Sequence, residues 1–202
     1  MITARKTSFL AAVTLALLLL PASVSAQKSG FFFRGNVGPA YSLFSSDADL
    51  DIKGASGIVS LSFGKFVSRN LVLFGDIFGS SITGPTLESG GVEVDTPDDV
   101  TSTLSAIGGG VGYYSDSNIY LGASLGISFI NIEWDDMGLE GRSDAGIGLS
   151  LIIGKDWQVG DKWNLGVAGH VIGGAIDDQG TTWTPTAFGV DFTFTYASGG
   201  IG

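Results

Sequence analysis

The sequence predicts an all-β chain that closes into an eight-stranded antiparallel up-and-down transmembrane β-barrel. Three observations predict this fold class: apolar and small polar side chains alternate with a period of two, the connections alternate between long and short, and aromatic residues gather near the expected strand ends. Glycine is abundant, at 32 residues, and the mean hydropathy is positive, so we expect a folded chain with closely spaced backbones.

Residues 119–129 show the alternation most clearly. Successive side chains of a strand point to opposite faces, so a period of two separates two environments. One face here is apolar, and the other carries only glycine, serine and one tyrosine instead of the lysine and glutamate typical of a water-exposed strand. The pattern fits a strand whose apolar face meets lipid and whose small face lines a narrow interior.

The same criterion predicts eight strands along the chain, at residues 31–44, 55–66, 71–83, 100–114, 119–134, 143–157, 163–176 and 186–196. The third strand is the least regular, because large apolar residues occur on both of its faces. Asp76 decides its orientation. A carboxylate facing lipid costs far more than a phenylalanine inside a barrel, so Asp76, Phe74 and Phe78 should point inward.

The connections between these strands alternate in length. Short connections fall at residues 68–70, 115–118 and 158–162, and longer ones fall at residues 45–54, 84–99, 135–142 and 177–185. With an even number of antiparallel strands, the short turns and both chain ends share one side of the barrel. Closure is required, because an open edge would leave backbone groups unsatisfied in hydrocarbon.

Aromatic residues lie near both predicted ends of the barrel. Membrane interfaces favour such girdles. The predicted girdle residues are Phe31, Phe32, Phe66, Tyr113, Trp157, Trp163 and Tyr196 at the short-turn end, and Tyr41, Phe44, Phe129, Trp134 and Trp183 at the other.

The N-terminus has the pattern of a cleavable secretory signal peptide at residues 1–26. Arg5 and Lys6 precede an uncharged run at residues 7–20, and Val24 with Ala26 supplies the small residues expected before a cleavage site. The apolar run is too short for a comfortable spanning helix. Residues 27–202 are then one barrel domain, and with no cysteine the chain has no disulfide or thiol chemistry.

The whole mature chain resembles the small eight-stranded outer-membrane β-barrels of Gram-negative bacteria, of the OmpX and OmpA transmembrane-domain type. The last strand also resembles the signal read by the barrel-assembly machinery, with Gly189, Phe192 and Phe194 in the G-x-x-aromatic-x-aromatic spacing, although residues 195–202 follow it here. The resemblance implies an outer-membrane location, embedding in outer-membrane lipid beside lipopolysaccharide, and assembly by that machinery.

The predicted interior is filled rather than open. Eight strands enclose a space about wide enough for side chains, and small inward residues such as Gly110, Gly122 and Gly148 would face bulky ones such as Phe74 and Tyr120. The predicted polar network of this interior comprises Arg34, Asn36, Asp76, Asp144, Asn164, His170 and Asp191. Because closure pairs the first and last strands, we expect an Arg34–Asp191 ion pair that braces the seam; the alternative is a narrow ion or proton path along the carboxylates.

His170 is the only histidine, which restricts enzymatic interpretations. The lipid A deacylases and palmitoyltransferases are eight-stranded enzymes that use a histidine with a serine and a carboxylate. Val171 and Ile172 follow His170, so the deacylase His-x-Ser spacing is absent, and no activated serine is visible beside a base. We therefore predict no enzymatic activity and no catalytic residue.

The long connections are strongly acidic, with 13 acidic and 2 basic residues, a local charge of −11. The simplest interpretation is a solvated surface that resists aggregation. The sharper one is binding of divalent cations shared with lipopolysaccharide, since hard cations take carboxylate oxygens. The candidate ligands are Asp47, Asp49, Asp51, Asp95, Asp98 and Asp99. No other cofactor is expected, and nucleic acid is disfavoured because this charge repels phosphates.

Two functions remain open from the sequence. The first, implied by the resemblance, is a non-enzymatic, monomeric barrel that contributes to envelope integrity or presents its acidic loops outside. The second is a small pore of the OmpW type for ions or small apolar solutes. A soluble lipocalin-like barrel would place its apolar face inward, and the near absence of lysine and glutamate on the other face argues against it.

Overall fold

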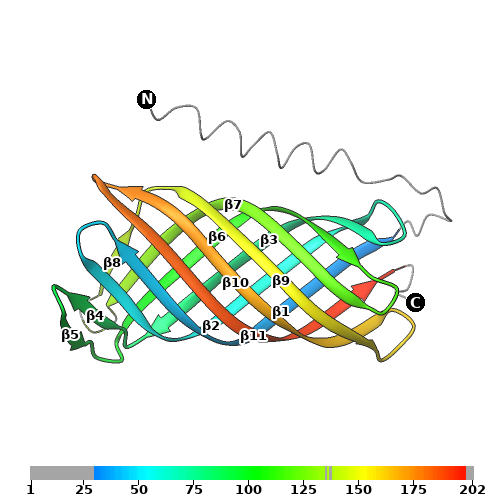
Figure 1. Ribbon diagram of the computed structural model, residues 1–202, viewed down its shortest axis with the longest axis horizontal. Helices are drawn as coiled ribbons and strands as arrows, with labels where there is room; N and C mark the ends of the chain where they lie inside the picture. The colour runs from blue at the N-terminus through cyan, green and yellow to red at the C-terminus, as the bar shows by residue number, and fades with distance from the viewer. Residues whose placement is uncertain (1–29, 135, 137, 199–202) are drawn as a thin grey trace.

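A computed structural model describes residues 30–134, 136 and 138–198 as a single closed barrel of eight long strands (Figure 1). The long strands are β1 (Phe31–Ser46), β2 (Leu50–Phe66), β3 (Leu71–Thr83), β6 (Val100–Tyr114), β7 (Ile119–Trp134), β9 (Gly146–Gln158), β10 (Trp163–Asp178) and β11 (Thr181–Ala197). This confirms the predicted fold class. The predicted signal peptide lies outside the described residues.

Closure is made by the first and last strands. β1 pairs antiparallel with β2 on one side and with β11 on the other, and every other long strand pairs antiparallel with its neighbours in the chain. The backbone N–H of Ser198 donates to the carbonyl of Phe31 at 3.0 Å, so the two ends of the barrel sequence meet at the short-turn end. We call this the periplasmic end, and the opposite one the extracellular end.

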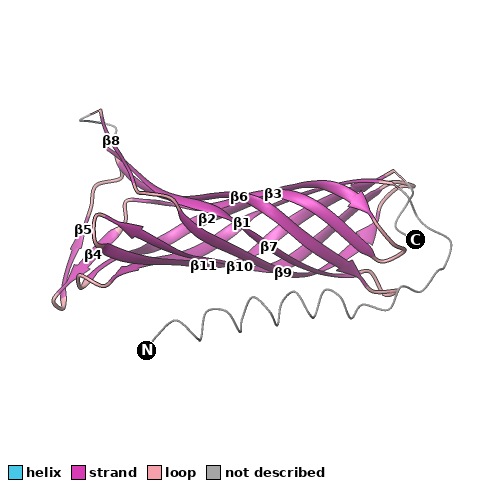
Figure 2. Ribbon diagram, turned by 90° about the horizontal axis from the view of Figure 1, so that it is seen from above, coloured by secondary structure: helices cyan, strands magenta, loops and turns pink. Residues whose placement is uncertain are grey.

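The long connections are shorter than predicted, because the strands continue beyond the barrel. β4 (Thr86–Ser89) and β5 (Val92–Asp95) form a hairpin against β2, and β8 (Leu139–Arg142) pairs with β7. Figure 2 shows all three projecting from one end. β10 and β11 are joined by Gln179 and Gly180, both with positive φ, as in a two-residue hairpin turn whose twist matches its strands.

The outward wall is a continuous apolar surface. Its exposed side chains include Val37, Val59, Leu61, Leu73, Ile77, Ile107, Leu121, Leu125, Ile127, Ile147, Leu149, Leu151, Ile153, Val167, Val171, Val190 and Phe192. On β7, Leu125 is 61 % exposed while its neighbour Ser124 is 5 % exposed, so the face assignment made from alternation is confirmed. A wall of this kind is matched to hydrocarbon. No helix among the described residues is long and apolar enough to cross a membrane.

The predicted girdles are only partly right. Trp157 and Trp163 are exposed near the periplasmic end, as interface residues should be. Phe32, Phe66 and Phe44 are wrong as girdle residues, because each lies on the inward face of its strand and is 3 % exposed or less. The period-two alternation of side chains already places these three residues on the inward face, opposite to that of their sequence neighbours.

Small residues make room for large ones inside the barrel, as predicted. A Cβ added to Gly112 would lie 2.6 Å from the Tyr120 hydroxyl oxygen, and one on Gly110 would lie 2.6 Å from Cε2 of Phe74. Either contact is far closer than packed atoms allow, so the glycines are the space into which the aromatic rings fit. The orientation of Phe74, Asp76 and Phe78 is also confirmed, since all three are buried.

Candidate functional site

Two apolar layers occupy the interior of the barrel, with buried polar residues between and among them. The periplasmic apolar layer comprises Phe32, Phe66, Val72, Phe74, Tyr114, Tyr120, Ile152, Ala168 and Ala197. The extracellular apolar layer comprises Phe44, Ile52, Ile58, Phe78, Ile82, Leu104, Ala106, Ile130, Ile172, Ile176 and Ala187. β3 shows the order directly, because Asp76 lies between Phe74 of one layer and Phe78 of the other. The interior therefore has a polar belt below the extracellular layer, and the periplasmic layer is interleaved with the belt residues Asp156 of β9 and Asn164 of β10.

Arg34 is the centre of the periplasmic part of this belt. Its side chain is fully buried and lies over the Tyr120 ring, with the guanidinium carbon 4.2 Å from the ring centroid. Nη1 donates to Asp156 Oδ2 at 2.7 Å and to Thr195 Oγ1 at 2.9 Å, and Nε donates to Asn36 Oδ1 at 3.0 Å. A charge taken out of water needs such a partner and such bonds, so these contacts offset part of the cost of burying Arg34; its Nη2 has no hydrogen-bond partner among the described residues.

Asp156 completes the cluster and is the residue that sequence reasoning missed. Its carboxylate accepts hydrogen bonds from the Tyr114 hydroxyl at 2.9 Å and the Thr193 hydroxyl at 3.2 Å, as well as the Arg34 ion pair. The sequence did indicate that Asp156 points inward, because it lies an even number of positions from the inward residues Ser150 and Ile152 on the same strand.

The predicted Arg34–Asp191 ion pair is wrong. Arg34 lies opposite Thr195 in the β1–β11 register, so Asp191 is four residues farther along β11, about 13 Å at the usual rise per residue. Asp191 instead pairs with His170, with Nδ1 and Oδ2 2.6 Å apart. Both residues are buried, as predicted, but they belong to a second cluster.

This second cluster has the connectivity of a catalytic triad. Because the Asp191 carboxylate accepts a hydrogen from Nδ1, Nε2 of a neutral His170 is left to accept one from the Ser150 hydroxyl, which lies 2.9 Å away. Ser150, His170 and Asp191 are each 1 % exposed. Ile172 of the extracellular apolar layer and Ala168 of the periplasmic layer flank His170 on β10, so no substrate can approach the serine in this structure.

The remaining predicted lumen residues divide into two groups. Asp76 accepts hydrogen bonds from Ser62 at 2.8 Å and Ser124 at 2.6 Å, and Asn164 is buried, as expected. Asp144 is wrong as a lumen residue. It precedes the first residue of β9 and is exposed, with its backbone N–H donating to the Asp178 carboxylate at 3.1 Å.

The predicted cation ligands are distributed over separate loops at the extracellular end. Asp47 accepts a hydrogen bond from the backbone of Thr182 at 3.0 Å, and Asp95 accepts one from the Thr86 hydroxyl at 2.8 Å. Asp49 lies in the β1–β2 turn, Asp51 lies in β2, and Asp98 and Asp99 precede β6. Within the part of the chain that the structure describes, no group of three or more acidic, histidine or cysteine residues could hold a metal ion. The divalent-cation site stays a prediction.

Lys53 is the base around which the β4–β5 hairpin is organised. Its ammonium lies 2.6 Å from a carboxylate oxygen of Glu88 and 2.6 Å from one of Glu93. The hydrogen bonds to Glu88 and Glu93 raise the pKa of Lys53 above its usual range. Part of the acidic surface is therefore neutralised by the chain itself.

A recess of about 240 Å³ opens at the extracellular mouth of the barrel. Arg142 and Asp178 line it, and its apolar lining includes Ile52, Ile130 and Trp183. Ile52 and Ile130 belong to the extracellular apolar layer, so the recess ends on buried side chains rather than on a channel.

No protein-family model and no curated protein sequence matches this chain. Among solved structures, Neisserial surface protein A (NspA) superposes with a TM-score of 0.53 at 16 % identity, covering 82 % of this chain and 96 % of NspA. Ail of Yersinia pestis has a TM-score of 0.44 at 9 % identity, covering 81 % of this chain and 98 % of Ail. OprG of Pseudomonas aeruginosa has a TM-score of 0.44 at 12 % identity, covering 85 % and 98 % of the two chains.

The NspA likeness establishes a shared fold. Together with strand closure and the apolar outward wall, it confirms the predicted resemblance and the predicted outer-membrane location. By fold, this chain is similar to the small eight-stranded outer-membrane β-barrels of Gram-negative bacteria.

Proposed function

We propose that this chain is a non-enzymatic, non-conducting outer-membrane barrel that acts as a monomer through its wall and its acidic extracellular loops. The filled interior is the observation that carries the proposal. The extracellular apolar layer covers the polar belt, and it contains fully buried side chains from separate parts of the wall, such as Phe78 of β3 and Ile172 of β10. A barrel filled in this way contributes stability to the envelope and a surface to the outside, not a path through it.

Planar-bilayer recording tests this proposal. We expect purified barrel, shown to be folded by its heat-modifiable gel mobility, to insert without single-channel steps in a bilayer in which a porin gives them. Reproducible steps that disappear in Asp76→Ala would contradict the proposal and favour the pore, because Asp76 lies in the belt that any ion would have to cross.

The acidic loops are the part of the proposal that concerns partners. At neutral pH their carboxylates would repel the anionic lipopolysaccharide around the barrel unless divalent cations lie between them. We expect barrel in lipopolysaccharide-containing vesicles to be more resistant to proteolysis of its loops with Mg²⁺ than with a chelator. A triple variant, Asp47→Asn, Asp49→Asn and Asp51→Asn, should lose most of this Mg²⁺-dependent protection. Unchanged protection would show that this loop is not the cation site.

We also propose, from the sequence of the last strand, that the barrel-assembly machinery is a partner of this chain. Phe192 is exposed on the outward face of β11, where a machine that receives the last strand could contact it. Phe192→Ala should reduce the amount of folded barrel in the outer membrane of cells. Refolding of the same variant from urea into detergent should be close to that of the wild type, because that reaction needs no assembly machinery.

A further inference from the structure

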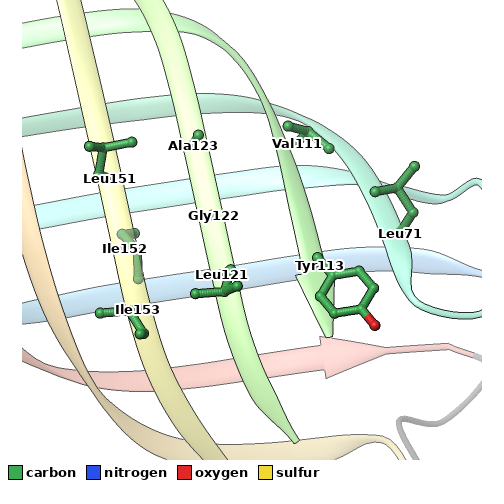
Figure 3. A pocket seen from close by; sticks show the side chains of 9 residues that line it. All are labelled: Leu71, Val111, Tyr113, Leu121, Gly122, Ala123, Leu151, Ile152 and Ile153. Carbon is green, nitrogen blue, oxygen red and sulfur yellow. The ribbon is translucent and has the colours of Figure 1, made fainter. Parts of the chain in front are cut away.

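The outward wall contains a groove of about 490 Å³ near the periplasmic turns, across β3, β6, β7 and β9 (Figure 3). Its lining includes Leu71, Val111, Tyr113, Leu121, Ala123 and Ile153. These side chains belong to the outward wall, so the groove opens toward lipid; Gly122 and Ile152 also line it. Nothing in the proposed function uses it.

The groove arises because a small residue lies among large ones. Ala123 pairs with Val111 of β6 and Leu151 of β9, so its methyl group forms a low floor between two branched side chains. Farther from the turns, Gly109 of β6 lies directly opposite Gly75 of β3. A Cβ on Gly75 would have no neighbour closer than 3.8 Å, so the wall stays low there and the hollow has room to continue toward the membrane centre.

A basic residue lies at the periplasmic end of this groove. Lys155 lies on the outward face of β9, two residues from Ile153 and opposite Ile119 of β7. Its ammonium donates to the carbonyl of Ser117 in the β6–β7 turn, which places the charge at the level where the hydrocarbon ends. Tyr113 lies at the same end of the groove, as Figure 3 shows, and is 45 % exposed.

We propose that this groove binds an anionic glycerophospholipid of the periplasmic leaflet, with one acyl chain along Ala123 and the phosphate at Lys155. Hydrocarbon is what surrounds the wall at this depth, and the branched side chains beside Ala123 give one chain a fixed course. An ammonium attracts a phosphate, and a tyrosine suits the boundary between hydrocarbon and headgroups. The proposal does not depend on the proposed function, since a pore would have the same wall.

A second copy of the chain is the other occupant that an apolar groove could take. A two-fold dimer through this face would bring both Lys155 residues to the edge of an apolar interface, where the groove lining offers neither ammonium a carboxylate. A charge that is desolvated without a partner is destabilising. The charge at the end of the groove therefore favours the lipid.

Native mass spectrometry of the barrel in detergent tests the proposal with two probes, dioleoylphosphatidylglycerol and dioleoylphosphatidylcholine. We expect the wild type to retain one phosphatidylglycerol. Lys155→Gln should weaken that binding about tenfold, equivalent to about 1.4 kcal/mol, and should leave the phosphatidylcholine signal unchanged. Ala123→Phe should reduce retention of both lipids, because the ring would fill the groove.

Two matched variants serve as controls. Lys65 is exposed on β2, between Phe31 of β1 and Leu73 of β3, at the same end of the barrel but across the groove from Lys155, so Lys65→Gln should bind phosphatidylglycerol as the wild type does if the phosphate lies at Lys155. Val171→Phe adds a ring to the outward face of β10 and should change nothing. Gel mobility shows that each variant is folded.

Three results would overturn the proposal. The first is equal retention of the two lipids by the wild type, and the second is a Lys155→Gln variant that matches Lys65→Gln. The third is a species with the mass of two chains that Ala123→Phe abolishes, which would assign the groove to a dimer.

Discussion

The arginine and histidine clusters of the polar belt have the same burial, but they span different distances around the barrel. The arginine cluster consists of Arg34, Asp156, Tyr114, Thr195 and Asn36, and the histidine cluster consists of Ser150, His170 and Asp191. The first joins β1 to β9 and β6, which are not its neighbours in the barrel, while the second joins only the adjacent strands β9, β10 and β11.

This difference indicates what each cluster does for the fold. Neighbouring strands are already held in register by their backbone ladders, so the histidine cluster supports contacts that exist without it. The arginine cluster fixes the distance across the interior, which no backbone hydrogen bond can do. We infer that the barrel depends more on the first cluster than on the second.

The largest expected effect is that of Arg34→Ala. It leaves the Asp156 carboxylate buried without its charged partner, which typically costs about 3 to 5 kcal/mol. Urea unfolding in lipid vesicles, followed by heat-modifiable gel mobility and tryptophan fluorescence, measures the free energy of unfolding. An unchanged unfolding midpoint would show that the cross-barrel pair does not brace the interior.

A double variant provides the control for that experiment. Arg34→Met with Asp156→Leu removes both charges and keeps much of the volume, and such replacements are often neutral or stabilising. We expect the double variant to recover most of the stability lost in Arg34→Ala. Equal losses in the single and double variants would mean that packing of the arginine stem, not the ion pair, carries the effect.

The second expected effect is that of His170→Leu, and it is smaller. Asp191 would lose the hydrogen bond to Nδ1, and leaving a buried acceptor unsatisfied costs about 1 to 3 kcal/mol. The same unfolding measurement applies. Asp191→Asn is the matched variant, because its amide oxygen can still accept from Nδ1, and it should lose less than His170→Leu. A loss in His170→Leu as large as that in Arg34→Ala would remove the distinction between the clusters.

Most of the barrel was predictable from sequence because lipid and interior impose a period of two on every strand. The predicted strands at residues 71–83, 100–114 and 119–134 coincide with β3, β6 and β7. The strand extensions above the membrane were not predicted. There water surrounds both faces, so alternation disappears and the acidic residues of β4 and β5 look like loop.

The polar belt was predictable by face but not by partner. The alternation of side chains along each strand predicted six inward polar residues, and all six are buried: Arg34, Asn36, Asp76, Asn164, His170 and Asp191. Partners depend on how far the strands are staggered around the barrel, which the pattern within one strand does not encode. The prediction for Asp144 is wrong for a different reason. Its strand begins only at Gly146, and side chains before the strand do not follow its alternation between inward and outward faces.

The third expected effect separates the contribution of Ser150 from that of the His170–Asp191 hydrogen bond. Ser150→Ala removes one neutral hydrogen bond to His170, worth about 0.5 to 1.5 kcal/mol. The pair of His170 and Asp191 remains. Unfolding in vesicles should therefore show a smaller loss of stability than His170→Leu does. A larger loss would place Ser150, rather than the His170–Asp191 hydrogen bond, at the centre of the histidine cluster.

The smallest expected effect is chemical and concerns the triad-like order of Ser150, His170 and Asp191. A fluorophosphonate reacts with a serine that a base activates, but it must reach the hydroxyl, and Ser150 is 1 % exposed between the two apolar layers. We expect no labelling of the folded barrel. Labelling that Ser150→Ala and His170→Leu both abolish would show that the interior opens and that the cluster is catalytic. The arginine cluster contains no serine and no histidine. That outcome would therefore also mean that the arginine cluster braces the barrel while the histidine cluster is an active site.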